Sequence, residues 1–137
     1  MVRLTLPLLT IGVALICGCR SDRQPLAGHR WVVVAIGDRQ FPVGSGGQPL
    51  TMTFDDATHR LSGFAGCNQY NASYTQRGDS LSIGPAVSTQ MACATGMDAE
   101  HALLGALPAI SSYQLPDTIL TLVGSGGVAV KLVVRQH

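Results

Sequence analysis

The sequence predicts a mostly β fold with one helix (α+β), built as a small antiparallel β-barrel or curled sheet capped by a single α-helix. Seven or eight short segments have strand character, most are joined by turn sequences, and one late segment has helical periodicity. Strands and helices do not alternate in the way that produces a parallel sheet. An antiparallel sheet of this size hides its edges by closing on itself.

The first strands follow from β-branched composition and period-two alternation. Residues 29–36 are β-branched and aromatic and lie between glycines, which predicts a strand. Glycine and proline dominate 42–49, so this segment is expected to be a loop. Alternation over 50–54 predicts a half-buried strand, with 59–65 returning as its partner.

Two more strands precede the helix. They are expected over 68–76 and 80–83, joined by a turn at 77–79. In the first of them Tyr70 and Tyr74 lie on one face.

The helix is expected to begin near residues 95–98. Thr95 or Asp98 can cap its free N–H groups, and Glu100 complements the helix dipole. Pro108 ends or kinks the helix near Leu107. The core-facing stripe consists of Leu103, Leu104, Leu107 and Ile110.

Three strands complete the fold. They are expected over 112–115, 118–123 and 128–134, and the last two are joined in a hairpin by the glycine-rich residues 124–127. No second helix is expected after residue 110.

Composition limits the possible partners. The chain has 137 residues, enough for one domain, and nine Lys+Arg against eight Asp+Glu give a net charge of +1. A charge this small provides no basic field for a nucleic-acid backbone, so no nucleic-acid partner is expected. Only 12% of the residues are charged, and part of the apolar excess comes from an uncharged run over 4–16.

The N-terminus is expected to be a lipoprotein signal peptide over 1–18. Its apolar run is shorter than the roughly 20 residues that a membrane-spanning helix needs. Ile16, Cys17 and Gly18 before Cys19 resemble the bacterial lipobox, which implies cleavage after Gly18 and a diacylglyceryl group on the Cys19 thiol. The alternative is ordinary secretion with Cys19 as a spare thiol.

This interpretation divides the chain into three parts. Residues 1–18 are the signal peptide, 19–26 are a lipidated tether, and 27–137 are the folded domain. Arg20 directly after the lipidated cysteine implies, in a two-membrane host, transfer to the outer membrane. The expected location is therefore the bacterial cell envelope, on the outer membrane facing the periplasm.

Cys67 and Cys93 are the thiols that remain after processing and lipidation. An exported chain with two cysteines usually pairs them, so a disulfide is favoured over a buried free thiol pair. A zinc site needs about four ligands, and these cysteines with His101 lack the paired spacing of such sites. No metal is expected.

The segments around the two cysteines resemble the META domain, a family that includes the heat-inducible HslJ-like bacterial lipoproteins. The similarity rests on 63–70 (Gly-Phe-Ala-Gly-Cys-Asn-Gln-Tyr), Tyr74, 88–93 (Ser-Thr-Gln-Met-Ala-Cys) and Glu100. It begins at 26–31 and extends to the final strand. Ala72 and Gln90 depart from the pattern, since glycine and arginine are common at those positions. The resemblance implies a small β-barrel with one helix and no established catalytic activity.

The family motif also supplies a possible binding face. Its residues are Gly66, Asn68, Tyr70, Tyr74, Thr89, Met91 and Glu100. Four of them have a structural alternative: Asn68 can satisfy backbone groups at a turn, Tyr70 and Tyr74 can pack across strands, and Met91 can fill a core gap.

The expected function is that of a non-enzymatic envelope lipoprotein. The resemblance links it to envelope stress, antibiotic tolerance or secretion. No nucleophile beside a base appears, the histidines are scattered, and most aspartates lie in predicted turns, so neither catalytic residues nor a cofactor are expected. The chain is expected to be a monomer and a binding or assembly module for an envelope protein or an apolar ligand. The alternatives are a periplasmic inhibitor or chaperone-like stress factor, and a hydrolase with an unrecognised site.

Overall fold

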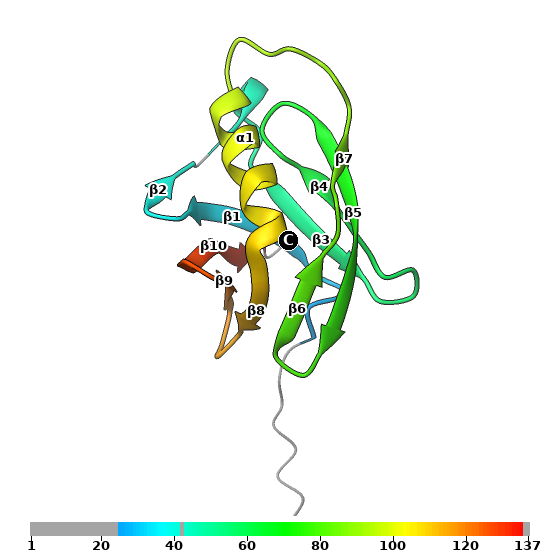
Figure 1. Cartoon of the computed structure of the whole chain (residues 1–137). Helices are drawn as coiled ribbons and strands as arrows, with labels where there is room; N and C mark the ends of the chain where they lie inside the picture. Colours follow the sequence, from blue (N-terminus) through cyan, green and yellow to red (C-terminus); the bar gives the residue numbers. More distant parts are fainter. Residues whose placement is uncertain (1–24, 42, 136–137) are drawn as a thin grey trace, which may run out of the picture.

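A computed structural model describes residues 25–41 and 43–135, which form an eight-stranded antiparallel barrel with one α-helix (Figure 1). The expected mostly β fold with a single helix is confirmed. The expected signal peptide over 1–18, the lipidated Cys19 and most of the tether lie outside the described residues.

The elements follow one another in the order expected from the sequence. The strands are β1 (Arg30–Ile36), β2 (Arg39–Gln40), β3 (Thr51–Asp55), β4 (Arg60–Phe64), β5 (Gln69–Arg77), β6 (Ser80–Ile83), β7 (Val87–Ser88), β8 (Ile110–Gln114), β9 (Ile119–Gly124) and β10 (Gly127–Val134). The helical elements are η1 (Ser45–Gly47), α1 (Met97–Ala106) and η2 (Leu107–Ala109). The two-residue strands β2 and β7 were not expected, because two residues are too few to display a period.

Hydrogen bonding between the first and last long strands closes the barrel. The sheet order is β10-β9-β8-β6-β5-β4-β3-β1, and β1 pairs with β10. β7 pairs with β5 beyond the stretch of β5 that pairs with β6. The junction of β6 and β8 is narrow, with a single registered pair between Ser80 and Ser112.

Apolar side chains from alternate positions of the strands fill the interior of the barrel. Trp31 is fully buried, and its indole Nε1 donates to Leu26 O at 2.9 Å, which fixes the chain where it enters the barrel. The largest fully buried side chains are Trp31, Tyr74, Phe54, Leu26, Leu50, Met52, Leu61, Leu81, Leu103, Leu107, Leu120 and Leu122.

The helix begins and ends close to the expected positions, but its expected cap and the extent of its apolar stripe are wrong. Leu103 and Leu104 lie in α1, whereas Leu107 lies in η2 and Ile110 begins β8. α1 begins at Met97 and is preceded by Gly96 in the left-handed region (φ 90°), with no side-chain cap from Thr95 or Asp98. A Cβ on Gly96 would lie 2.2 Å from Gly66 O, so close approach to another turn requires glycine here. Pro108 lies in η2 directly after the helix, as the ring geometry of proline requires.

The barrel has two distinct ends. Ala27 forms an isolated bridge with Phe54 near the end of β3, so the chain enters beside the β3–β4 turn at 56–59; we call this the tether end. The β4–β5 turn at 65–68 lies at the opposite end, because β4 runs antiparallel to β3. Figure 1 shows α1 at that opposite end, with the connection from β7 looping over to it; we call this the helix end.

Gly63 in β4 allows two strands and an aromatic ring to meet closely. A Cβ at this position would lie 1.9 Å from Thr51 O and 3.1 Å from a ring carbon of Tyr70. The Tyr70 hydroxyl donates to the same Thr51 carbonyl at 3.0 Å. Residue 63 therefore has no room for a methyl group.

We expect Gly63→Ala to lower the free energy of unfolding by about 1–3 kcal/mol, because the added methyl group forces the strands apart. Gly105→Ala is the control, since a Cβ there meets nothing within 4 Å and alanine favours a helix. Urea denaturation measures both variants. Equal stability of the two would show that β3 and β4 separate freely at this point.

Candidate functional site

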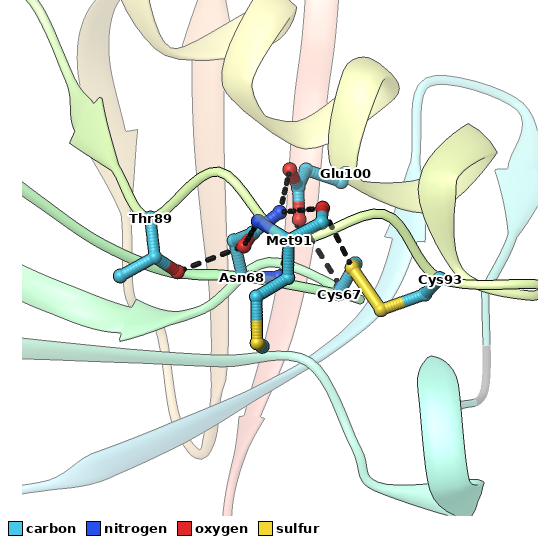
Figure 2. Close-up of a disulfide and its surroundings, with 6 residues drawn as sticks. All are labelled: Cys67, Asn68, Thr89, Met91, Cys93 and Glu100. Atoms are coloured by element: carbon cyan, nitrogen blue, oxygen red, sulfur yellow. Dashed lines mark hydrogen bonds between the residues drawn. A yellow bond between two sulfur atoms is a disulfide. The ribbon is translucent and has the colours of Figure 1, made fainter.

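Four residues of the family motif and the two cysteines meet in one cluster at the helix end (Figure 2), whereas Tyr70 and Tyr74 lie elsewhere in the core. We call it the motif cluster, and its members are Cys67, Asn68, Thr89, Met91, Cys93 and Glu100. It joins three separate segments: the turn at 65–68, the connection between β7 and α1, and the first turns of α1.

Cys67 and Cys93 form the expected disulfide. Their Cα atoms are 5.8 Å apart and the bond links residues separated by 26 positions. The Cys67 sulfur also lies 3.3 Å from Met91 O, which is a contact and not a hydrogen bond because a disulfide sulfur carries no proton. The described residues contain no group of three or more His, Cys, Asp or Glu that could hold a metal ion.

The Asn68 side chain uses its full hydrogen-bonding capacity. Its Oδ1 accepts from Thr89 Oγ1 and from Met91 N, each at 2.8 Å. Its Nδ2 donates to Met91 O at 3.0 Å and to Glu100 Oε1 at 2.8 Å. An amide side chain has two donors and two acceptor positions, so no capacity remains for a ligand. The side chain of Asn68 thus bonds backbone groups, as the structural alternative expected, but these belong to Met91, 23 residues away, and not to its own turn.

Glu100 is a buried carboxylate that holds the 65–68 turn. It is 4% exposed, and its Oε2 accepts from Asn68 N at 2.6 Å and Cys67 N at 3.1 Å. A buried charge is costly unless it is hydrogen-bonded, and here three donors and the positive end of α1 surround it. The sequence suggests only the interaction with the helix dipole. The contacts with the turn bridge more than thirty residues and have no local signal.

Glycines let the turn at 65–68, the start of α1 and the loop containing η1 approach one another. Gly66 has φ 130°, and a Cβ on it would lie 2.5 Å from Gly96 O. Its carbonyl accepts from Ser45 N at 2.6 Å, which docks the loop containing η1 onto the turn. A Cβ on Gly44 would in turn lie 2.4 Å from Gly66 O. The contact between this loop and the turn was not predicted from the sequence, although the run of glycines in the loop was the available signal.

Tyr70 and Tyr74 face the core, each 2% exposed. Tyr74 donates to Asp56 Oδ1 at 2.8 Å, and its ring meets Phe54 edge-on with centroids 5.1 Å apart. Burial raises the pKa of both phenols well above the usual range, so both stay neutral at physiological pH. The structure therefore places both tyrosines in internal packing.

The interpretation of Met91 as a core residue is wrong. Its side chain is 60% exposed. The N–H and C=O groups of Met91 both bind Asn68, and the side chain leads away from Glu100 and the disulfide (Figure 2). Met91 belongs to a segment over 84–95 that we call the outer strap. Val87 in the same segment is 66% exposed, and no charged residue occurs between positions 80 and 97.

The polar groups of the motif cluster thus form hydrogen bonds with one another. The part of the cluster region that faces solvent is the outer strap. In the part of the chain that the structure describes, every buried side-chain nitrogen and oxygen has a hydrogen-bond partner. The cluster fixes the backbone of the strap at several points, while Val87 and Met91 remain in solvent. Over the described ranges, no helix is long and apolar enough to span a membrane.

Comparison with known families agrees with this architecture. The family model of the META domain matches residues 24–137. The chain belongs to the META domain family. No protein with a curated description matches it.

Three solved structures are similar to this META domain. A protein from Burkholderia xenovorans, determined by NMR, is 32% identical, with 82% of this chain and 85% of that chain covered and a TM-score of 0.65. A second protein determined by NMR is 20% identical over 80% of this chain and 91% of its own, with a TM-score of 0.62. A DUF4847 family protein from Bacteroides vulgatus is 14% identical over 82% and 96%, with a TM-score of 0.58. The last two share the fold alone.

Replacing Cys67 and Cys93 together by alanine is expected to lower the free energy of unfolding by about 3–4 kcal/mol, the chain-entropy estimate for a loop of this length. Thermal and urea unfolding without reductant measure the loss. Adding dithiothreitol should destabilise the wild type toward the variant and leave the variant unchanged. An unchanged unfolding curve in the variant would contradict a structural role for the bridge.

Glu100→Gln is expected to cost about 1–3 kcal/mol of stability, because both carboxylate oxygens accept hydrogen bonds. In either orientation the glutamine NH2 group faces a buried donor, which leaves N–H groups unpaired. Asp98→Asn is the matched control, since Asp98 lies exposed in the same helical turn. Denaturation of both variants with the disulfide intact separates the two effects. A loss of the same size in Asp98→Asn would assign the effect to the helix dipole instead of the turn.

Proposed function

We propose that this META domain protein is a non-enzymatic lipoprotein of the bacterial envelope, anchored through Cys19, whose barrel is a rigid module for binding or assembling envelope proteins. The observation that supports it best is the exposed outer strap, an uncharged segment held by the disulfide and by Asn68. Its location would be the outer membrane, facing the periplasm.

The filled interior favours a partner that binds the surface over an apolar ligand within the barrel. Trp31, Phe54 and Tyr74 occupy the interior together with a shell of buried leucines. A ligand cavity lined with apolar groups would need that space. Protein recognition needs only an exposed, well-ordered patch with large apolar side chains, such as Val87 and Met91.

The placement of the strap fits an anchored protein. The described chain enters at the tether end, and the motif cluster lies at the helix end. A lipid on Cys19 would therefore hold the tether end toward the membrane and leave the strap free for a partner in the periplasm.

A non-enzymatic role is supported by how the motif residues are used. Asn68 has no free donor or acceptor, and three donors already bind the Glu100 carboxylate. Groups engaged in this way hold a backbone conformation and do not contact a substrate.

The anchor is tested by expressing the full precursor in a two-membrane bacterium. The mass of the N-terminal peptide should show a diacylglyceryl cysteine at position 19, and detergent-phase partition should be lost in Cys19→Ser. Recovery of an unmodified N-terminal peptide from the wild type would refute the anchor.

The binding role is tested with a photo-reactive amino acid placed at Met91 in living cells. A discrete cross-link to one envelope protein is expected, and it should weaken when Val87→Glu is added, because a charge disrupts the apolar contact. Thr58 at the tether end is the control position, exposed but remote from the strap. Identical products from both positions, or none from Met91, would contradict a binding surface on the strap.

A further inference from the structure

The outer surface of β1, β10 and β9 carries an apolar row. Trp31, Val33 and Leu132 point into the barrel, so their neighbours in sequence point outward. Val32 pairs with Val133, and Val133 pairs with Ile119, so three outward side chains lie side by side across three strands. Ile119 is 50% exposed, and Val34, at the irregularity in β1, is 37% exposed.

Cations border this row. Arg30 precedes Val32 by two positions, and Lys131 and Arg135 lie two positions on either side of Val133, so all three share the outward direction. The Arg135 N–H donates to Arg30 O at 3.2 Å, which brings the two arginine backbones together. We call Arg30, Lys131, Arg135, Val32, Val133 and Ile119 the basic–apolar face.

The strands of this face contain no acidic residue. β1, β9 and β10 contribute Arg30 and Lys131, and Arg135 follows directly. Asp38 lines an open hollow of about 570 Å³ together with Lys131 and Val34, and Asp117 precedes β9. Asp55 and Asp56 line a second open hollow together with Arg30. Carboxylates therefore border the face, while the strands that form it carry only cations.

The tether keeps this face near the membrane. Leu26, which is buried, lies seven positions after Cys19, and a chain of that length spans at most about 25 Å. Arg30 follows four residues later, at the start of β1. Anchoring at Cys19 therefore raises the concentration of the face at the lipid surface far above its bulk value.

We propose that the basic–apolar face lies against the membrane that carries the anchor and binds its anionic phospholipid headgroups. The inference rests on the lipid anchor of the proposed function. Guanidinium and ammonium groups would pair with lipid phosphates, while Ile119, Val133 and Val32 enter the boundary between headgroups and acyl chains. Orientation by this face adds to the anchor, which by itself leaves the domain free to rotate.

The barrel order places the outer strap on the far side of this face. β5, to which β7 pairs, lies four strands from β10 in the closed order of eight. A domain resting on β1 and β10 would therefore turn the strap away from the lipid, where a partner protein can reach it.

The test uses residues 20–137 without the lipid, which retain every described strand, the helix and the disulfide. Flotation with phosphatidylcholine vesicles containing phosphatidylglycerol measures partition at low and physiological salt. Binding is expected to need phosphatidylglycerol and to weaken with salt. Lys131→Glu should lower the partition coefficient roughly tenfold, and Ile119→Ser should also reduce it.

Arg77→Glu is the matched control, because it reverses one exposed charge on β5, across the barrel from β10. It should bind within about twofold of the wild type. Equal losses in Arg77→Glu and Lys131→Glu, or equal binding to pure phosphatidylcholine, would overturn the proposal. Unfolding midpoints confirm that each variant is folded. Since this chain carries no anchor, the result is independent of the lipidation test at Cys19.

Discussion

The helix end of the barrel depends on one buried carboxylate. Glu100 accepts two backbone N–H groups of the 65–68 turn and the amide of Asn68, and Asn68 in turn fixes Met91. Without an acceptor at this point the turn would bury unpaired donors, which is costlier than losing an ordinary contact. Cys67 lies in the same turn, so the position of the disulfide that it forms depends on this carboxylate as well.

The covalent and hydrogen-bonded links act on different states of the chain. The Cys67–Cys93 bond restricts the unfolded ensemble, whereas Asn68 and Glu100 stabilise the native arrangement directly. Together they hold the strap at two points: the disulfide binds Cys93, and Asn68 binds the backbone of Met91. An exposed uncharged segment that is already ordered loses little entropy when a partner binds, which is the physical argument for recognition at this surface.

Local patterns predict the parts of this fold that local physics determines. Alternation identifies β3 and β5, and the apolar stripe containing Leu103 identifies α1. The cap at Gly96 and the outward side chain of Met91 escape prediction, since each depends on contacts with residues distant in sequence. The cysteines could be paired from their number and from the export that the N-terminal sequence predicts, because a disulfide needs no periodicity.

Closure of the barrel gives the chain two opposite surfaces with different chemistry. Pairing of β1 with β10 creates a continuous outer face with Arg30 and Lys131, and the same closure puts β5 and the strap across the core. An open sheet would leave these two surfaces free to bend relative to each other. Because side chains fill the closed barrel, tilting one surface tilts the other, and lipid contact on one side would set the direction in which Met91 is presented on the other.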